Sequence, residues 1–143
     1  MLFSASRKHK IVSTSTAETL AKVSGFVVDA GKCQVVAVTV KGTKAGDVIE
    51  WPAITAFGAD AVTVPSETAF TTASGPIRDL AGRDHRIMGK FVLSTDGDAQ
   101  GEVTDVEFDG ATGRISFVMV DGAPVAGDRL VGLGRYAVVI RTA

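Results

Sequence analysis

The sequence predicts a mainly β protein built from two small barrels, and three observations support this fold class. The 143 residues include 20 Val and 7 Ile against only 6 Leu, and branching at Cβ favours strands over helices. Sixteen glycines offer turns between short apolar runs. Similar segments also recur in the same order, 76 to 82 residues apart.

Composition narrows the class of protein further. Hydrophobic residues make up 45% of the chain and charged residues 22%, which is typical of a globular domain. The 15 Lys and Arg against 16 Asp and Glu give a net charge of −1, which excludes a strongly basic nucleic-acid binder but allows a local basic patch.

Cellular location is predicted from cysteine usage and from the length of the apolar runs. Cys33 is the only cysteine, so no disulfide forms within the chain, and a reducing cytoplasm fits this usage. The first ten residues lack the apolar core of a signal peptide, and no apolar run approaches the roughly 18 residues that span a bilayer. We therefore expect a soluble, cytoplasmic protein.

Short strands separated by turns are expected in the first half. Turns are predicted at Ala30-Gly31 and at residues 58–60, where small and polar residues cluster. The apolar runs between such breaks predict strands at residues 23–28, 33–40, 48–51, 54–57 and 61–64.

The second half follows the same plan. Val106 and Phe108 alternate with acidic residues, which indicates a strand with one buried face. A tight turn at residues 110–113 then leads to an apolar strand at 115–120, forming a hairpin. Residues 122–128, with Pro124, are expected to be a loop, and residues 129–133 and 136–140 a final strand pair.

A linker separates the two halves. Residues 66–73 and 76–81 are each expected to form a turn or two of helix, because Pro76 suits a helix start. We therefore divide the chain into a first barrel at 1–66, a partly helical linker at 67–88 and a second barrel at 89–143. Each half alone has a marginal core, so we expect the halves to pack on each other or on another chain.

The recurring segments suggest a duplication. Their order is the same in both halves, and the small insertions between them fall at Gly, Asp and Ala positions, where turns tolerate insertions. The matched segments are 10–14 with 90–95, 22–24 with 102–104, 28–29 with 108–109, 32–38 with 114–120, 45–47 with 126–128, and 61–64 with 137–140.

Residues 89–109, read as GKFVLSTDGDAQGEVTDVEFD, and the turn and strand at 112–120 resemble the opening of the PRC-barrel domain family. Residues 49–54 and 60–64 resemble its closing strands. The first half departs from the family by lacking an Asp-Gly turn, and the second has Val131-Gly132-Leu133 where the first has Trp51-Pro52.

The resemblance implies two tandem PRC-type β-barrels with no catalytic centre of their own. Relatives of this kind include the barrel of the photosynthetic reaction-centre H subunit and that of ribosome-maturation factors. In such proteins the barrel binds protein partners.

Two candidate partner-binding sites stand out. Trp51 beside Pro52 could anchor a partner, since exposed Trp is favoured at interfaces, or it could cap the barrel core. Arg83, His85 and Arg86 lie in a basic stretch that could contact RNA. Asp79 and Asp84 interrupt that stretch, so it could equally be a solvated linker that includes Arg78 and Lys90.

Residues Asp96–Glu107 nearly fit the calcium-binding loop of an EF-hand, with acids at loop positions one and three, glycine at six and glutamate at twelve. An EF-hand needs helices on both sides, however, and strands are expected here. The preferred interpretation is a turn that enters a strand, and calcium binding is left open.

No other motif in the sequence indicates a metal-binding, catalytic or cofactor-binding site. His9 and His85 lack further ligands at metal-site spacing, and the nucleophile elbow, the phosphate loop and the dinucleotide fingerprint are absent from the sequence. We expect no catalytic residues, no cofactor and no metal site.

These observations favour a non-catalytic protein-binding or assembly module that acts in an oligomer. The alternative is an RNA- or ribosome-associated maturation factor acting through the basic linker. A third, weaker hypothesis is a metal- or small-molecule-dependent enzyme with His85 in a polar pocket.

Overall fold

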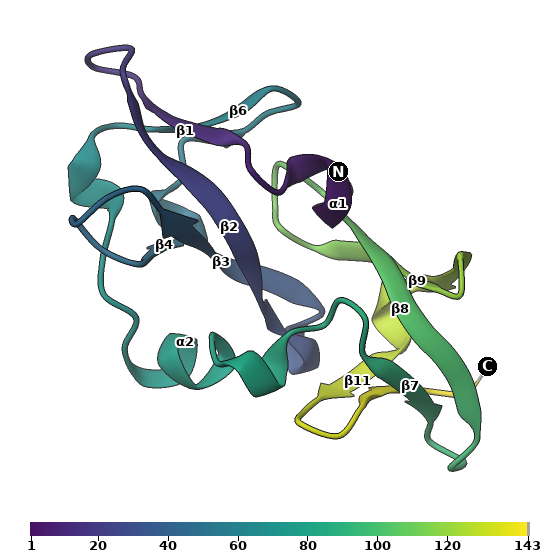
Figure 1. The fold of residues 1–143 in the computed structure, drawn as a ribbon. Coiled ribbons are helices and arrows are strands. Elements are labelled where there is room, and N and C mark those ends of the chain that lie inside the picture. The colour runs from purple at the N-terminus through teal and green to yellow at the C-terminus, as the bar shows by residue number, and fades with distance from the viewer. Residues whose placement is uncertain (143) are drawn as a thin grey trace.

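The chain forms two six-stranded sheets, one in each half (Figure 1). The structure, a computed structural model, describes residues 1–142. The first sheet holds β1 (Lys10–Ser13), β2 (Thr19–Asp29), β3 (Gln34–Lys41), β4 (Val48–Glu50), β5 (Ala56–Phe57) and β6 (Ala61–Val64). The second holds β7 (Phe91–Ser94), β8 (Ala99–Phe108), β9 (Ile115–Val120), β10 (Ala123–Ala126), β11 (Leu130–Leu133) and β12 (Val138–Ile140).

Helical turns are short and lie between the strands or before them. The α-helices are α1 (Phe3–Ser6) and α2 (Gly75–Leu80). The 3-10 turns are η1 (Ala30–Lys32), η2 (Trp51–Ala53), η3 (Glu67–Ala69), η4 (Arg83–His85) and η5 (Gly127–Arg129). The predicted mainly β fold with two barrel-like sheets is therefore confirmed, and the segment between the sheets is partly helical.

The strand order is the same in both sheets. It is β4-β3-β2-β1-β6-β5 in the first and β10-β9-β8-β7-β12-β11 in the second. Each sheet has one parallel pair, β1 with β6 and β7 with β12, among antiparallel neighbours. The pair formed by the second and third strands of each half also carries bulges at corresponding places. The β2–β3 register shifts after Val23 and Val27, and the β8–β9 register shifts after Val103 and Glu107.

The strand registers define matching positions in the two halves. Val35 lies opposite Val28, and Ile115 lies opposite Phe108, so Val35 matches Ile115. The sequence comparison had set residues 32–38 against 114–120, which is wrong by two residues. A shift of two leaves the inward and outward faces of a strand unchanged, so apolar alternation alone could not detect it.

A second sequence match is also wrong. Residues 45–47 precede β4, whereas residues 126–128 end β10 and enter η5. The expected loop at 122–128 in fact contains strand β10, which pairs with β9 across a two-residue turn. Asp121 and Gly122 both have positive φ there, 49° and 83°, as this hairpin turn requires. Pro124 obscured the strand in the sequence.

The two sheets join through a symmetric backbone contact. The Val35 N–H donates to the Gly113 carbonyl at 2.8 Å, and the Ile115 N–H donates to the Cys33 carbonyl at 2.8 Å. Cys33 and Gly113 are matching residues with positive φ, 52° and 78°. Each half therefore presents the same groups to the other, as in a twofold-symmetric interface.

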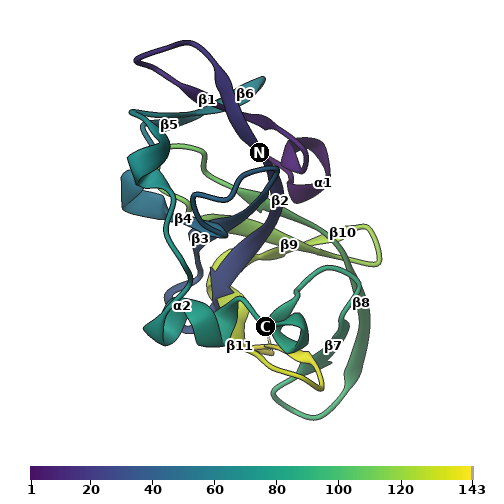
Figure 2. The ribbon, with the colours of Figure 1, turned by 60° about the vertical axis from the view of Figure 1, so that its left-hand side comes forward.

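The N-terminal segment ties the first sheet to the second (Figure 2). Leu2 pairs with Glu107, and the Phe108 N–H donates to the Met1 carbonyl at 2.8 Å. The buried apolar side chains of both halves form one continuous cluster. The expectation that the halves pack on each other is confirmed.

Candidate functional site

Aromatic side chains gather at the seam between the two sheets. Phe108 of β8 lies within 5.2 to 6.1 Å of four rings from the first half, measured between ring centroids, and these are the rings of Phe57, Phe3, Phe26 and Trp51. Phe3 stacks on Phe26 at 4.0 Å. Rings from both halves therefore build one side of the seam.

Trp51 is placed in this cluster by the short turn η2. Glu50 before it is extended, and Pro52 has the fixed φ that suits the start of a helical turn. The indole of Trp51 stacks on Phe57 at 5.8 Å with an interplanar angle of 13°, and it meets the edge of Phe108 at 6.1 Å and 88°. Trp51 is half-buried, so it both contacts the core and keeps an open face.

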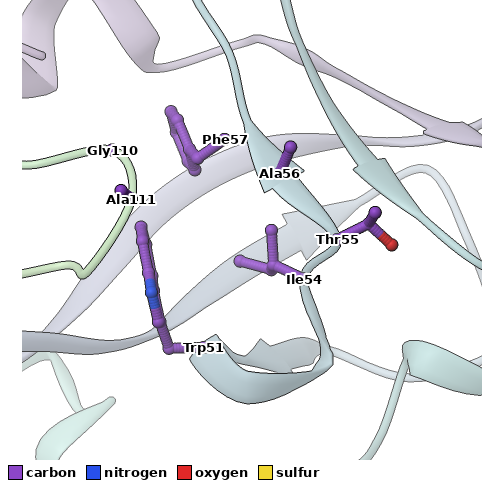
Figure 3. Close-up of a pocket in the computed structure, with 7 residues that line it drawn as sticks. All are labelled: Trp51, Ile54, Thr55, Ala56, Phe57, Gly110 and Ala111. Carbon is purple, nitrogen blue, oxygen red and sulfur yellow. The ribbon is translucent and has the colours of Figure 1, made fainter.

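An open groove of about 410 Å³ lies beside Trp51 (Figure 3). The rings of Trp51 and Phe57 and the side chain of Ile54 point into the same space. No charged side chain lines the groove, whose wall is formed by Trp51, Ile54, Thr55, Ala56, Phe57, Gly110 and Ala111.

The matching place on the other side of the seam is built differently. Gly127, the first residue of η5, matches Trp51, the first residue of η2. The sequence comparison placed Val131-Gly132-Leu133 opposite Trp51-Pro52, which is wrong by four residues. A Cβ on Gly127 would lie 2.1 Å from the Ile115 carbonyl oxygen, so no side chain fits there. There η1 packs directly on β11, with the Cys33 Sγ 3.6 Å from the Leu130 carbonyl oxygen. Because the shared fold does not require a groove, we attribute this one to the Trp51 side chain.

The basic residues predicted as a second site lie apart from Trp51. Arg83, His85 and Arg86 follow one another in and after η4, which runs between α2 and β7. Arg83 and Arg86 are exposed and His85 is half-buried. The structure thus brings these three together on one turn, while Trp51 belongs to the seam.

Lys90, also part of the predicted basic stretch, has a structural role. Its ammonium group donates to the Asp84 carbonyl oxygen at 2.5 Å and to the Gly134 carbonyl oxygen at 2.9 Å. This places the β11–β12 turn, with Arg135 and Tyr136, beside η4. Sequence reasoning missed Arg135 and Tyr136 because they lie about fifty residues further along the chain.

The segment Asp96–Glu107 is a hairpin turn followed by β8, with strand β7 before it. The Ser94 hydroxyl accepts from the backbone N–H groups of Asp96 and Asp98, at 3.3 and 3.2 Å. One Asp96 carboxylate oxygen accepts from the Thr142 hydroxyl at 2.9 Å. The predicted turn and strand are present, and they replace the two helices that an EF-hand requires.

His9 also lies at the seam. Its ring stacks on Phe57 at 5.9 Å, and its Nε2 is buried without a hydrogen-bond partner among residues 1–142. Within the same part of the chain, no group of three or more His, Cys, Asp or Glu side chains could hold a metal ion. No helix of residues 1–142 has the length and apolarity needed to cross a membrane.

Comparison with known proteins gives one family. No curated protein matches the chain. The family match begins at residue 81, within the segment expected to be a linker, and it ends just after β12. Its span contains η4 and all six strands of the second sheet. Residues 81–141 match the family model of the PRC-barrel domain, so the second half of this chain is similar to that family.

Proposed function

We propose that this chain is a non-catalytic protein-binding module that docks a partner in the groove beside Trp51. One observation supports this most directly: two halves with the same strand order differ at the seam, where one side holds Trp51 and a groove, and the other holds Gly127, at which no side chain fits. A feature that the fold does not require is a candidate for function.

The groove suits an extended segment of a partner protein. Its lining is uncharged and offers about as much polar as apolar surface, and a half-buried Trp is a common anchor at protein interfaces. Strand β5 borders the groove and is the last strand of its sheet, where it pairs with β6. An edge strand beside the rings of Trp51 and Phe57 can take up a partner's backbone while the rings contact one of its side chains.

A non-catalytic role fits the chemistry of the groove. Its walls carry aromatic, aliphatic and threonine side chains, which offer no general base and no strong nucleophile. Similarity of the second half to the PRC-barrel domain is compatible with this role.

We also propose that the first half is a second PRC-type barrel, making the chain a tandem pair. The common strand order and the bulges at matching places support this. We assign the protein to the cytoplasm because its single cysteine, Cys33, is free. We take a segment of a different protein as the occupant of the groove, and a second copy of this chain is the alternative that the experiment below distinguishes.

Blocking the groove tests the proposal. Ala111→Arg places a long charged side chain in the groove from an exposed position, so it should abolish partner capture from cell extract without unfolding the protein. Ala123→Arg is the matched control, because Ala123 is exposed on β10 and does not line the groove. A photocrosslinking amino acid at Thr55 should give an adduct with the same partner.

The capture and light-scattering experiments can each contradict part of the proposal. Capture that survives Ala111→Arg, or falls equally with Ala123→Arg, would overturn the groove as the docking site. Light scattering of the purified protein separates the two kinds of partner: a dimer that Ala111→Arg dissociates would replace the foreign partner by a second copy of the chain.

A further inference from the structure

A second surface differs between the two halves, and unlike the uncharged groove it is basic and aromatic. Its cationic members are Arg83 and Arg86 from η4 and Arg135 from the β11–β12 turn, all exposed. Tyr136 follows Arg135 and is 78% exposed, the most exposed large apolar side chain among residues 1–142. We call these four residues the basic–aromatic patch.

Lys90 holds the two parts of the patch together. Its side chain is half-buried and donates to the carbonyl oxygens of Asp84 in η4 and Gly134 in the β11–β12 turn. Both ribbon views show these two turns side by side (Figures 1 and 2). The patch is therefore assembled by folding from residues about fifty positions apart.

Tyr136 is supported but not covered. Its ring meets Phe91 of β7 edge to face, with centroids 5.9 Å apart and an interplanar angle of 67°. Phe91 is half-buried, so it fixes one side of the Tyr136 ring. The rest of the ring is free to stack with a planar group from solution.

The matching turn of the first half carries neither a cation nor a ring. Gly58 and Gly134 match, because the N–H of each donates across its turn, to Ala61 at 2.9 Å and to Ala137 at 3.1 Å. Ala59 and Asp60 therefore stand where the second half has Arg135 and Tyr136. Since both turns connect matching strands, the fold does not require a cation or a ring at this place.

We propose that the basic–aromatic patch binds single-stranded nucleic acid. The three guanidinium groups would contact phosphates, and the exposed Tyr136 ring would stack on an unpaired base, the pairing of contacts typical of single-strand binding. A duplex keeps its bases stacked on each other, so it can use the guanidinium groups but not the ring. This surface is separate from the groove beside Trp51 and does not depend on the function proposed for it.

The size and charge of the basic–aromatic patch determine how tightly we expect it to bind nucleic acid. Three arginines, with the Asp84 carboxylate on the same turn, can neutralise only a few phosphates. With a net charge of −1, the whole chain adds no general attraction for a polyanion. Binding should therefore be weak, confined to a few nucleotides and sensitive to salt.

Fluorescence anisotropy with a labelled 12-nucleotide oligouridine tests the proposal on the full chain. Tyr136→Ala should weaken binding at least about fivefold, the lower end of what one base–aromatic stack contributes, and Tyr136→Phe should restore most of it. Arg83→Ala with Arg86→Ala should weaken binding and also flatten its dependence on salt concentration, because fewer phosphates are contacted. Arg114→Ala is the matched control, since Arg114 is exposed and lies at the seam, outside the patch.

Three results would overturn the proposal. One is no binding of oligouridine by the unaltered protein at 50 mM salt. Another is an equal loss of binding with Arg114→Ala. The third is unchanged binding with Tyr136→Ala together with equal affinity for heparin, which would make the surface a general polyanion contact. Circular dichroism of each variant confirms that it is folded, and the high exposure of Tyr136 makes its replacement harmless to the core.

Discussion

Trp51 and Gly127 occupy matching positions and have opposite steric surroundings. Each begins the 3-10 turn that follows the fourth strand of its half. The Trp51 indole contacts Phe57 and Phe108, whereas a Cβ on Gly127 would lie 2.1 Å from the Ile115 carbonyl oxygen. One side of the seam thus has room for the largest side chain, and the other has room for none.

Gly127→Ala should be strongly destabilising. The added Cβ would collide with backbone atoms of Ile115, which cannot move without disturbing the joint between the sheets. We expect the free energy of unfolding in urea to fall by about 2–3 kcal/mol, as in overpacked cores. Gly132→Ala is the control, because a Cβ there meets nothing within 4 Å and should change stability by less than about 0.5 kcal/mol. Equal effects of the two substitutions would contradict the steric argument.

Lys8→Gly should stabilise the protein. Lys8 has φ of 79° and its match Gly89 has φ of 77°, a conformation that costs an L-residue about 1–2 kcal/mol. Lys8 is exposed, so removing its side chain breaks few contacts, and we expect the free energy of unfolding to rise by about 0.5–1 kcal/mol. Gly89→Ala should lower the free energy of unfolding by a similar amount, because a Cβ there meets nothing within 4 Å and only the backbone conformation is affected. Thermal denaturation would measure both, and a loss of stability in Lys8→Gly would refute the prediction.

The two halves should unfold together. Phe108 from the second half is 1% exposed and contacts rings of the first half, and the apolar core is continuous. Phe108→Ala should cost about 3–5 kcal/mol and shift a single transition. Trp51 fluorescence reports the seam and far-ultraviolet circular dichroism reports both sheets, so the two curves should coincide. Separate transitions would show that each half is stable alone.

The strands could be predicted from the sequence because each is a local pattern. Alternation along residues 103–108 marks the buried face of β8, and the apolar run at 115–120 coincides with β9. The seam could not be predicted in this way. Trp51 and Gly110 line one groove only because the sheets join at Gln34 and Arg114, and no local pattern specifies that joint.

The same reason explains which parts of the candidate sites were missed. Arg83 and Arg86 are neighbours in sequence, so the basic stretch was visible, but Arg135 and Tyr136 reach it through hydrogen bonds of Lys90. In the sequence, Asp79 and Asp84 interrupt the basic stretch, and a solvated linker was therefore an equal alternative. Folding supplies an exposed ring from a distant turn, so linear spacing was a poor guide to this surface.

The outer edge of β10 is protected by Pro124. The matching residue Val48 makes two outward hydrogen bonds with Thr71, since the Val48 N–H donates at 3.1 Å and the Val48 carbonyl accepts at 3.0 Å. Thr71 therefore covers the outer edge of β4. Pro124 has no N–H, so it cannot make the equivalent donation, and a proline at such a place discourages pairing with another chain.

Pro124→Val should expose this edge and cause self-association. The substitution restores an outward N–H on β10, which pairs only with β9 among residues 1–142, and two such edges can pair antiparallel. We expect light scattering to show a mass that rises with concentration in Pro124→Val but not in the unaltered protein. Ala123→Val is the control, because Ala123 is also exposed on β10 and gains the same side chain without gaining a donor. If Ala123→Val associates as strongly as Pro124→Val, added apolar surface rather than the restored N–H drives pairing, and proline is not the protecting element.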